Sequence, residues 1–265
     1  MYNFKDTYNR LIEEASKYQC LRSVGLDEKS DIVPMTTADM DFKLADEIGK
    51  EIKKYVDSHV LGYSRMTQEY LDVCLAYYKK NYNYEPKRDS IVTIPGIVTA
   101  LSTAVGAYTK ENDKVIIFTP VYPPFYEVVE MQNRELSKCK LIDEGGNYKI
   151  NFKELEELAK DEKAKLILLS NPHNPESRVW TKEELEKIAK ISKENKLIVV
   201  SDEIHSDVIY DWYKHTCYWN LSDAKYNSII CYEASKTYNI ADLQCSNIII
   251  ENKAYTINLF KQTYQ

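Results

Sequence analysis

The sequence predicts an α/β fold in which a mostly parallel, mixed sheet carries helices on both faces. Apolar, β-rich runs alternate with amphipathic helical patterns from residue 90 onward. Most of these runs are apolar on consecutive residues, which is typical of parallel strands covered on both faces. With 265 residues the chain is long enough to bury a core of this kind.

Six apolar runs are predicted to be strands of this sheet. Each is rich in Ile, Val or Leu and ends in polar or turn-forming residues. The predicted strands are 90–95, 114–120, 165–172, 196–204, 227–235 and 246–252.

Amphipathic patterns predict the helices. Between the strands they lie at 97–110, 124–135, 151–163 and 181–196. Thr181 and Glu184 have the spacing of a capping box, and Asn151 with Glu154 repeats that N-terminal signal. Before the sheet, helical patterns at 2–18, 44–60 and 68–83 predict an N-terminal arm and a helical lead-in.

Composition excludes several classes of protein. The net charge of −6 argues against electrostatic binding of nucleic acid or an anionic membrane. No apolar run approaches the roughly 20 residues of a transmembrane helix. The polar start of the chain predicts a cytoplasmic protein. Six scattered cysteines without a C-x-x-C pair are expected to be free thiols rather than metal ligands.

Residues with chemically useful side chains stand where the predicted strands end. Tyr122, Asn174, Asp202 and Lys236 each follow or close a different strand. In open α/β sheets, ligands bind beyond the carboxyl ends of the strands. The sequence therefore predicts one binding site made from these four residues.

These side chains match the parts of pyridoxal 5'-phosphate (PLP). Lys236 is suited to Schiff-base formation with a carbonyl group. Asp202 would keep the pyridine nitrogen protonated, the state in which PLP is an electron sink. Tyr122 would stack on the ring, and Asn174 would donate its amide to the ring oxygen.

A glycine turn completes the predicted cofactor site. Gly96 lies between a strand and a helix, where it would leave the amides of Ile97 and Val98 open to a phosphate. Taken singly, each site residue also has a structural interpretation: a solvated lysine, a capping aspartate, a core tyrosine or a turn asparagine. Their joint placement favours the functional interpretation.

Several words of the sequence resemble the fold-type I PLP enzymes of aminotransferase class I/II. They are ADMDF, GYSR, TPVYPPFY, SNPHNP, SDEIHSD and ASKTYNIADLQCSN, in the order of the family. The chain most resembles the cystathionine or cysteine-S-conjugate β-lyases of the MalY/PatB type. The resemblance runs through the chain from Val33.

The resemblance implies roles for the matching residues. Lys236 would carry the cofactor and move the proton, Asp202 would bind the pyridine nitrogen, and Asn174 the ring oxygen. Tyr122 would stack on the ring, and His205 would lie near the ring oxygen.

It also implies groups around the phosphate and the entrance. Ser235 and the turn Gly96-Ile97-Val98 would hold the phosphate. Tyr63, in GYSR, would reach the phosphate of a neighbouring subunit, which implies a homodimer with shared sites. Asp39 and Asp41 would lie in the arm that borders the substrate entrance.

The implied organisation has three parts. Residues 1–45 would form an N-terminal arm and part of the small domain, and residues 46–255 the PLP-binding large domain. Residues 256–265 would begin the interdomain helix, with the remainder of an incomplete small domain absent, so the family pattern is expected to be truncated at its C-terminal side.

The implied reaction is β-elimination of cystathionine or another cysteine S-conjugate, which yields a thiol, pyruvate and ammonia. Two alternatives stay open: an aminotransferase that uses the same cofactor groups, and a non-catalytic remnant of the PLP fold.

Four residues depart from the family pattern. Ser177 replaces a glycine, so a positive φ is expected there at some cost. Glu176, Glu233 and Asp242 bring acidic side chains to positions where the family has small, hydroxylic or glycine residues, and they are expected to weaken PLP binding.

Overall fold

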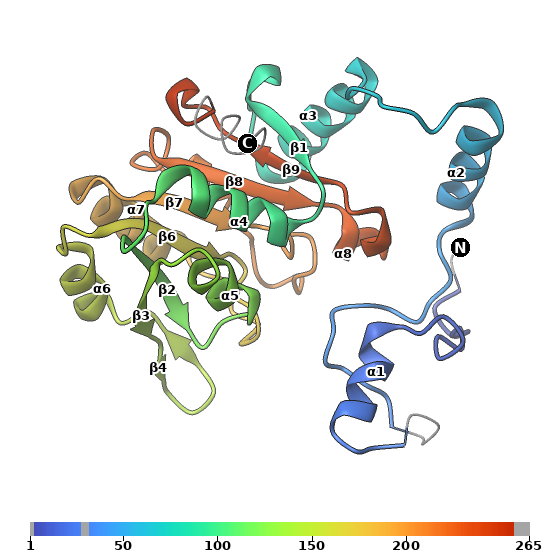
Figure 1. The fold of residues 1–265 in the computed structure, drawn as a ribbon, viewed down its shortest axis with the longest axis horizontal. Helices are drawn as coiled ribbons and strands as arrows, with labels where there is room; N and C mark the ends of the chain where they lie inside the picture. The colour runs from blue at the N-terminus through green and yellow to red at the C-terminus, as the bar shows by residue number, and fades with distance from the viewer. Residues whose placement is uncertain (1–2, 28–31, 257–265) are drawn as a thin grey trace. The chain divides into compact units, whose positions relative to one another are not determined.

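The chain divides into two units in the computed structural model, which describes residues 3–27 and 32–256 (Figure 1). One unit combines Met1–Arg65 with Ala234–Leu243, and the other combines Met66–Glu233 with Gln244–Gln265. The second unit contains the sheet. The three-part division predicted from the family remains a prediction, and its last part, apart from residue 256, lies outside the described residues.

A mixed sheet of seven strands organises the larger unit. The strand order is β1-β9-β8-β7-β6-β2-β3. All neighbours among β8, β7, β6, β2 and β3 are parallel, whereas β9 is antiparallel to both β1 and β8. The strands are β1 (Ile91–Ile94), β2 (Lys114–Thr119), β3 (Glu135–Lys140), β6 (Ala164–Ser170), β7 (Ile198–Asp202), β8 (Ser228–Glu233) and β9 (Ser246–Ile249).

Helices cover both faces of this sheet (Figure 1). Alternate strand residues face opposite sides, so Ile116 and Phe118 of β2 join one buried cluster and Val115 and Ile117 join the other. The first cluster includes side chains of α3 (Gln68–Tyr82), α6 (Phe152–Ala159) and α7 (Lys182–Glu194). The second includes those of α4 (Ile97–Tyr108) and α5 (Pro124–Glu130).

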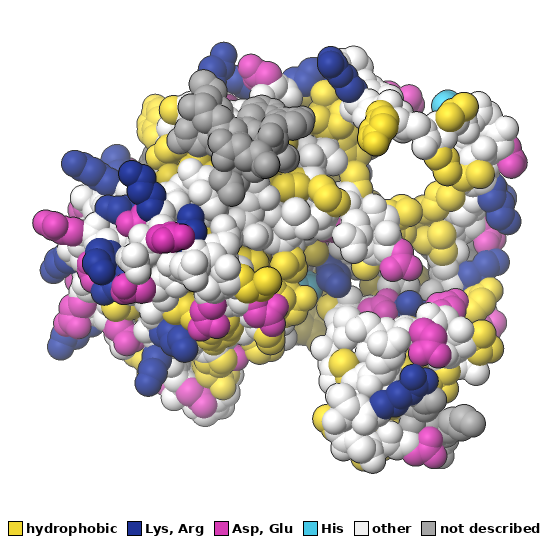
Figure 2. Space-filling view, viewed as in Figure 1, with side chains coloured by type: hydrophobic (Ala, Val, Ile, Leu, Met, Phe, Trp, Pro, Cys, Tyr) yellow, Lys and Arg dark blue, Asp and Glu magenta, His cyan; other side chains and the backbone are white. Residues whose placement is uncertain are grey.

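Short elements complete this unit. A hairpin is formed by β4 (Ile142–Asp143) and β5 (Tyr148–Lys149), and two single 3₁₀ turns are η1 (Arg88–Ser90) and η2 (Tyr218–Asn220). Acidic and basic side chains lie interspersed over the surface of the sheet unit in Figure 2. Among the described residues, no helix is both long and apolar enough to span a bilayer.

The smaller unit contains little regular structure. Its elements are α1 (Ser16–Ser23), α2 (Asp46–Ser58), α8 (Ser235–Tyr238) and the 3₁₀ turn η3 (Ala241–Leu243). It combines residues that precede the sheet with residues 234–243, which connect β8 to β9.

The predicted strands are confirmed, and so are both N-terminal caps. Thr181 Oγ1 accepts from the Glu184 amide at 3.2 Å, while Glu184 Oε2 accepts from the Thr181 amide at 2.8 Å. The side chain of Asn151 accepts from the Glu154 amide at 3.2 Å. Each cap satisfies amides that the first turn of a helix leaves without a partner.

The predicted helix at 2–18 is wrong where the chain is described, since α1 begins only at Ser16. Asn3 Oδ1 accepts from the Lys5 amide at 2.8 Å, and Asn9 Oδ1 accepts from the Leu11 amide at 3.2 Å. Asparagine side chains that bond nearby amides compete with helix formation.

The predicted helix at 124–135 is too long, and strand β3 after it was not predicted. Helix α5 ends at Glu130, and Asn133 has a φ of 58° before β3 begins at Glu135. As an edge strand, β3 alternates buried and charged residues, a pattern that edge strands use to avoid pairing with other chains.

Candidate cofactor site

The topology brings the ends of five strands to one edge of the sheet. Because β9 runs antiparallel to both β1 and β8, β1 points in the same direction as β8, β7, β6 and β2. Their carboxyl ends therefore share an edge. The predicted site residues of the larger unit all follow or close these strands.

Tyr122 and Asn174 meet directly at this edge. The amide of Tyr122 donates to the carbonyl oxygen of Asn174 at 3.0 Å, which joins the segment after β2 to the segment after β6. The amide of Asn174 donates to Ser170 Oγ at 3.1 Å. Its carboxamide has no hydrogen-bond partner within 3–27 and 32–256, so it remains available to a ligand.

Asp202 closes β7 beside these two residues. The residue is 6% exposed, and Oδ1 accepts from the Ile204 amide at 3.1 Å. Its carbonyl oxygen accepts from the Asn171 amide at 2.9 Å, which ties β7 to the segment that carries Asn174. Burial, and then the nearby Asp202 carboxylate, raise the pKa of the Tyr122 phenol. The structure thus brings Tyr122, Asn174 and Asp202 together.

His205 lies in the turn that follows Asp202. Its side chain is partly buried, and its carbonyl oxygen accepts from the Val208 amide at 2.9 Å. His205 thus belongs to the turn that begins at the buried Asp202 carboxylate.

Gly96 forms the strand-to-helix turn after β1. It is the N-cap of α4 with a φ of 79°, a conformation that residues with a Cβ rarely adopt. A Cβ at this position would stand 3.3 Å from Gln244 Oε1. Glycine also supplies no capping side chain, so no N-cap side chain binds the first amides of α4, which include those of Ile97 and Val98.

Lys236, Ser235 and Tyr63 belong to the smaller unit. Lys236 follows the end of β8 by three residues and lies in α8, where its Nζ donates to the carbonyl oxygen of Ala38 at 3.0 Å. Ser235 is buried and Tyr63 is fully exposed. Lys236 therefore has a neutral acceptor within its own unit and is not an unpaired buried cation.

Glu203 is a supporting residue that sequence reasoning missed. It is 2% exposed and accepts from Ser201 Oγ at 2.9 Å, from the Tyr218 amide at 2.9 Å and from His215 Nε2 at 2.8 Å. The signal was an acidic residue directly after Asp202 at the end of an apolar strand. Such a residue must be paired if it is buried.

The positive φ expected at Ser177 is confirmed at 54°. The neighbouring Glu176 side chain is 7% exposed, and its Oε2 lies 3.3 Å from His173 Nε2. Burial raises the pKa of Glu176 and lowers that of His173 to about 4, while His173 Nε2 donates to Pro120 O at 2.8 Å. Both changes favour the neutral forms of this pair.

The other two departures differ in burial. Glu233 is 6% exposed at the end of β8, where its Oε2 accepts from Ser246 Oγ of the neighbouring strand. Asp242 is exposed in η3. The buried acid therefore has a hydrogen-bond donor, and the exposed acid keeps its hydration.

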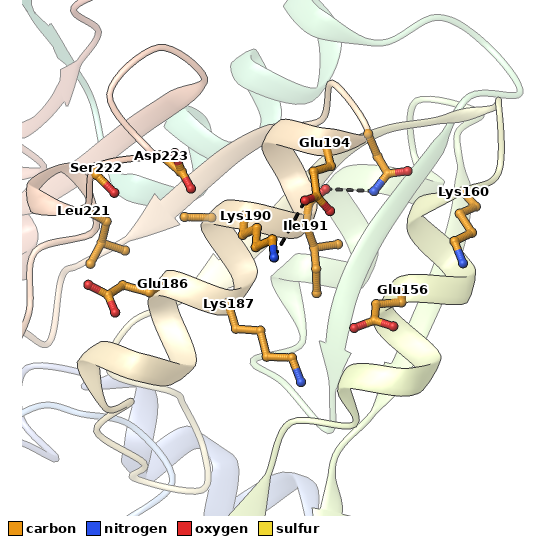
Figure 3. A pocket seen from close by; sticks show the side chains of 12 residues that line it. Glu156, Lys160, Glu186, Lys187, Lys190, Ile191, Glu194, Leu221, Ser222 and Asp223 are labelled. Carbon is orange, nitrogen blue, oxygen red and sulfur yellow. Dashed lines mark hydrogen bonds and ion pairs between the residues drawn. The ribbon is translucent and has the colours of Figure 1, made fainter.

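A surface hollow of the sheet unit is lined by other residues (Figure 3). Its lining comes from α6, α7 and residues 221–223, and it alternates basic and acidic side chains such as Lys187 and Glu186. None of the predicted site residues lines it. This pattern is typical of solvated helix faces rather than of a ligand pocket.

Known proteins share this architecture. The crystal structure of cystalysin from Treponema denticola, described as containing a pyridoxal 5'-phosphate cofactor, matches with a TM-score of 0.95 and 37% identity. The match covers 99% of this chain and 67% of that one. The fold is that of the large domain of the PLP transferases.

Sequence comparison identifies the family of the chain. The family described as aminotransferase class I and II matches residues 30–261, and the chain belongs to this family. Cystathionine beta-lyase PatB of Bacillus subtilis (strain 168) is 40% identical over 225 residues, which are 84% of this chain and 58% of that protein. Protein MalY of Escherichia coli (strain K12) is 28% identical over 85% of this chain and 57% of its own length. The chain thus spans somewhat more than half the length of these relatives.

Proposed function

We propose that the protein binds PLP and catalyses β-elimination from cysteine S-conjugates such as cystathionine. The observation that carries the proposal is the shared sheet edge, where Tyr122, Asn174 and Asp202 meet and where the Gly96 turn and the end of β8 also lie. The similarity to a cystathionine beta-lyase at 40% identity supports the choice of reaction.

The residues at this edge fit the cofactor. A Cβ would narrow the turn at Gly96, so the glycine leaves a cradle in which the amides of Ile97 and Val98 would receive the phosphate, with Ser235. The Asn174 carboxamide, which has no partner among the described residues, would donate to the ring oxygen, with His205 near it.

The ring itself would be held by two groups. Tyr122 would stack on one face, and the buried Asp202 carboxylate would accept from the pyridine nitrogen. When bound, PLP would supply an electron sink for the carbanion at Cα.

Lys236 would perform the proton transfers. As the covalent attachment point it would hold the cofactor, and its amino group, when free, would take the proton from the substrate Cα. The sulfur leaves Cβ with its bonding electrons as a thiolate, which takes up a proton. Hydrolysis of the remaining three-carbon fragment gives pyruvate and ammonia.

We further propose a cytoplasmic homodimer. Tyr63 is fully exposed within its own chain, which suits a residue that reaches the phosphate of a neighbouring subunit. All six cysteines are free thiols, as expected in a reducing compartment.

The visible absorption spectrum of the chain with PLP tests the cofactor, beside Lys236→Ala and a matched Lys253→Ala control. Lysine-bound PLP absorbs in the visible, so the parent and Lys253→Ala should show the band and Lys236→Ala should not. Absence of the band in the parent would favour the non-catalytic remnant.

Product analysis tests the reaction. The proposal expects pyruvate from cystathionine without an added keto acid, and loss of pyruvate in Lys236→Ala. A band without pyruvate, but with transfer of an amino group to an added keto acid, would assign an aminotransferase instead.

A further inference from the structure

A four-residue backbone segment, Ala38–Asp41, holds the turn that carries Lys236. Lys236 Nζ donates to the carbonyl oxygen of Ala38 at 3.0 Å. Two residues further along the segment, Asn239 Oδ1 accepts from the Met40 amide at 3.0 Å, and Asn239 Nδ2 donates to the Met40 carbonyl oxygen at 3.1 Å. One asparagine side chain thus satisfies both polar groups of one peptide residue, as a neighbouring strand would.

Two cations of the N-terminal arm also bind this segment. Arg10 pairs with the carboxylate of Asp39, and its Nη1 also donates to the Met40 carbonyl oxygen at 3.2 Å. Lys17, whose side chain is 3% exposed, lies 2.7 Å from Asp41 Oδ1 and donates to the Asp39 carbonyl oxygen at 3.0 Å. Both acids are therefore engaged by cations of this chain.

We propose that Ala38–Asp41 is a positioning device for Lys236, in which Asn239 fixes Met40 and thereby the Ala38 carbonyl oxygen that accepts the lysine amino group. This inference rests on the proposed role of Lys236 as the cofactor-binding lysine. The Ala38 oxygen receives the amino group whenever it is free, so a side chain with many rotamers keeps one position. Asp39 and Asp41 serve as anchors for this device rather than as substrate ligands.

The conformation of Asn239 allows its two functions to be separated. Its φ is 54°, the left-handed conformation at the C-cap of α8. Glycine adopts this conformation without cost, whereas it lacks both hydrogen bonds to Met40. Asn239→Gly therefore removes the clamp and leaves the turn geometry accessible.

Competitive labelling of the cofactor-free chain tests the device. At one fixed pH, a trace of acetic anhydride acetylates the unprotonated amino groups of lysines faster where they are accessible, and mass spectrometry gives the rate at Lys236 relative to the exposed Lys54. We expect this ratio to rise about fivefold in Asn239→Gly, the scale of a lost net hydrogen bond. The matched control is Asn83→Gly, which changes an asparagine with a φ of 50° at the C-cap of α3 and should leave the ratio unchanged.

Asn239→Asp provides the second variant. It retains the acceptor for the Met40 amide and loses the donor to the Met40 carbonyl, so it should give an intermediate ratio. Equal ratios in the parent, Asn239→Gly and Asn239→Asp would overturn the inference. A uniform rise at all lysines would mean that the variant unfolds, and the Asn239→Asp ratio then decides.

The absorption spectrum with PLP keeps the two proposals distinct. A band in the parent together with unchanged Lys236 labelling in the variants would overturn only the positioning device. No band in the parent, with Lys236 labelling that depends on Asn239, would overturn the cofactor proposal and leave the device.

Discussion

The turn after β7 is fixed from its buried side, whereas the lysine turn is fixed by the backbone of a segment far away in sequence. Behind Asp202, Glu203 accepts from Ser201, His215 and the Tyr218 amide, all in the interior of the sheet unit. Lys236 instead depends on Ala38, nearly two hundred residues earlier in the chain.

The difference shows that the two turns have different sources of order. The packed sheet holds Asp202 in position, so Asp202 should move only when the sheet unit itself is destabilised. Lys236 is held by a few hydrogen bonds and ion pairs, and these can open locally without global unfolding.

Removal of Glu203 should have the largest effect on stability. Glu203→Ala leaves His215, Ser201 and the Tyr218 amide without their buried acceptor, and we expect the free energy of unfolding to fall by about 4 kcal/mol. Urea denaturation measures this. The control Glu186→Ala changes an exposed residue of α7 and should stay within about 0.5 kcal/mol. A loss of less than about 1 kcal/mol for Glu203→Ala would show that the sheet alone fixes this turn.

Acidification should destabilise the sheet unit through His173. Burial lowers the pKa of His173 from 6.5 to about 4, so the folded state binds fewer protons than the unfolded state between these values. The stability from neutral His173 is complete above pH 6.5 and is lost as the pH falls to about 4, by about 3 kcal/mol.

The variant His173→Gln isolates this contribution. Glutamine retains a donor for the Pro120 carbonyl oxygen and does not titrate. The raised pKa of Glu176 acts in the opposite direction, because the folded state then takes up a proton more readily on acidification. Since Glu176 is present in both proteins, the comparison concerns His173. Denaturation curves with the same pH dependence in both would contradict the assignment.

Loss of Lys17 should loosen the lysine turn without affecting the sheet. Lys17→Met removes the partner of Asp41 and a donor to the Asp39 carbonyl oxygen. We expect the local opening free energy of the Met40 amide to fall by about 1 to 2 kcal/mol, measured by hydrogen exchange. Lys43→Met, which breaks an exposed pair with Asp46, is the control. Equal exchange at Met40 in the parent and Lys17→Met would refute a role for the arm.

The smallest expected effect is a gain at Ser177. Ser177→Gly relieves a φ of 54° at an exposed position, and we expect stability to rise by about 0.5 to 1 kcal/mol. Thermal denaturation measures the gain. Ser222→Gly, at an exposed residue without a positive φ, should give none. If Ser177→Gly and Ser222→Gly changed the stability by the same amount, the strain at Ser177 would be absent.

Sequence patterns predicted six of the seven strands of the sheet. The six predicted strands carry consecutive Ile, Val and Leu residues, a local signal that burial on both faces imposes. Strand β3 was not predicted, because its lysines and its glutamate make the alternation of an edge strand hard to recognise in the sequence. The helix at 2–18 failed because asparagine side chains bonded the backbone amides, a competition that hydrophobic periodicity does not reveal.

The sequence by itself determined the alternation of strands and helices, the residues at the strand ends and the glycine at the Gly96 turn, because these follow from local periodicity and backbone conformation. The tertiary structure decided that β9 runs antiparallel, that four donors share the Glu203 carboxylate, and that backbone groups of Ala38 and Met40 bind Lys236 and Asn239. Most of these contacts join residues far apart in the chain. Their partners are selected by packing and by the need to satisfy buried polar groups, which no local pattern records.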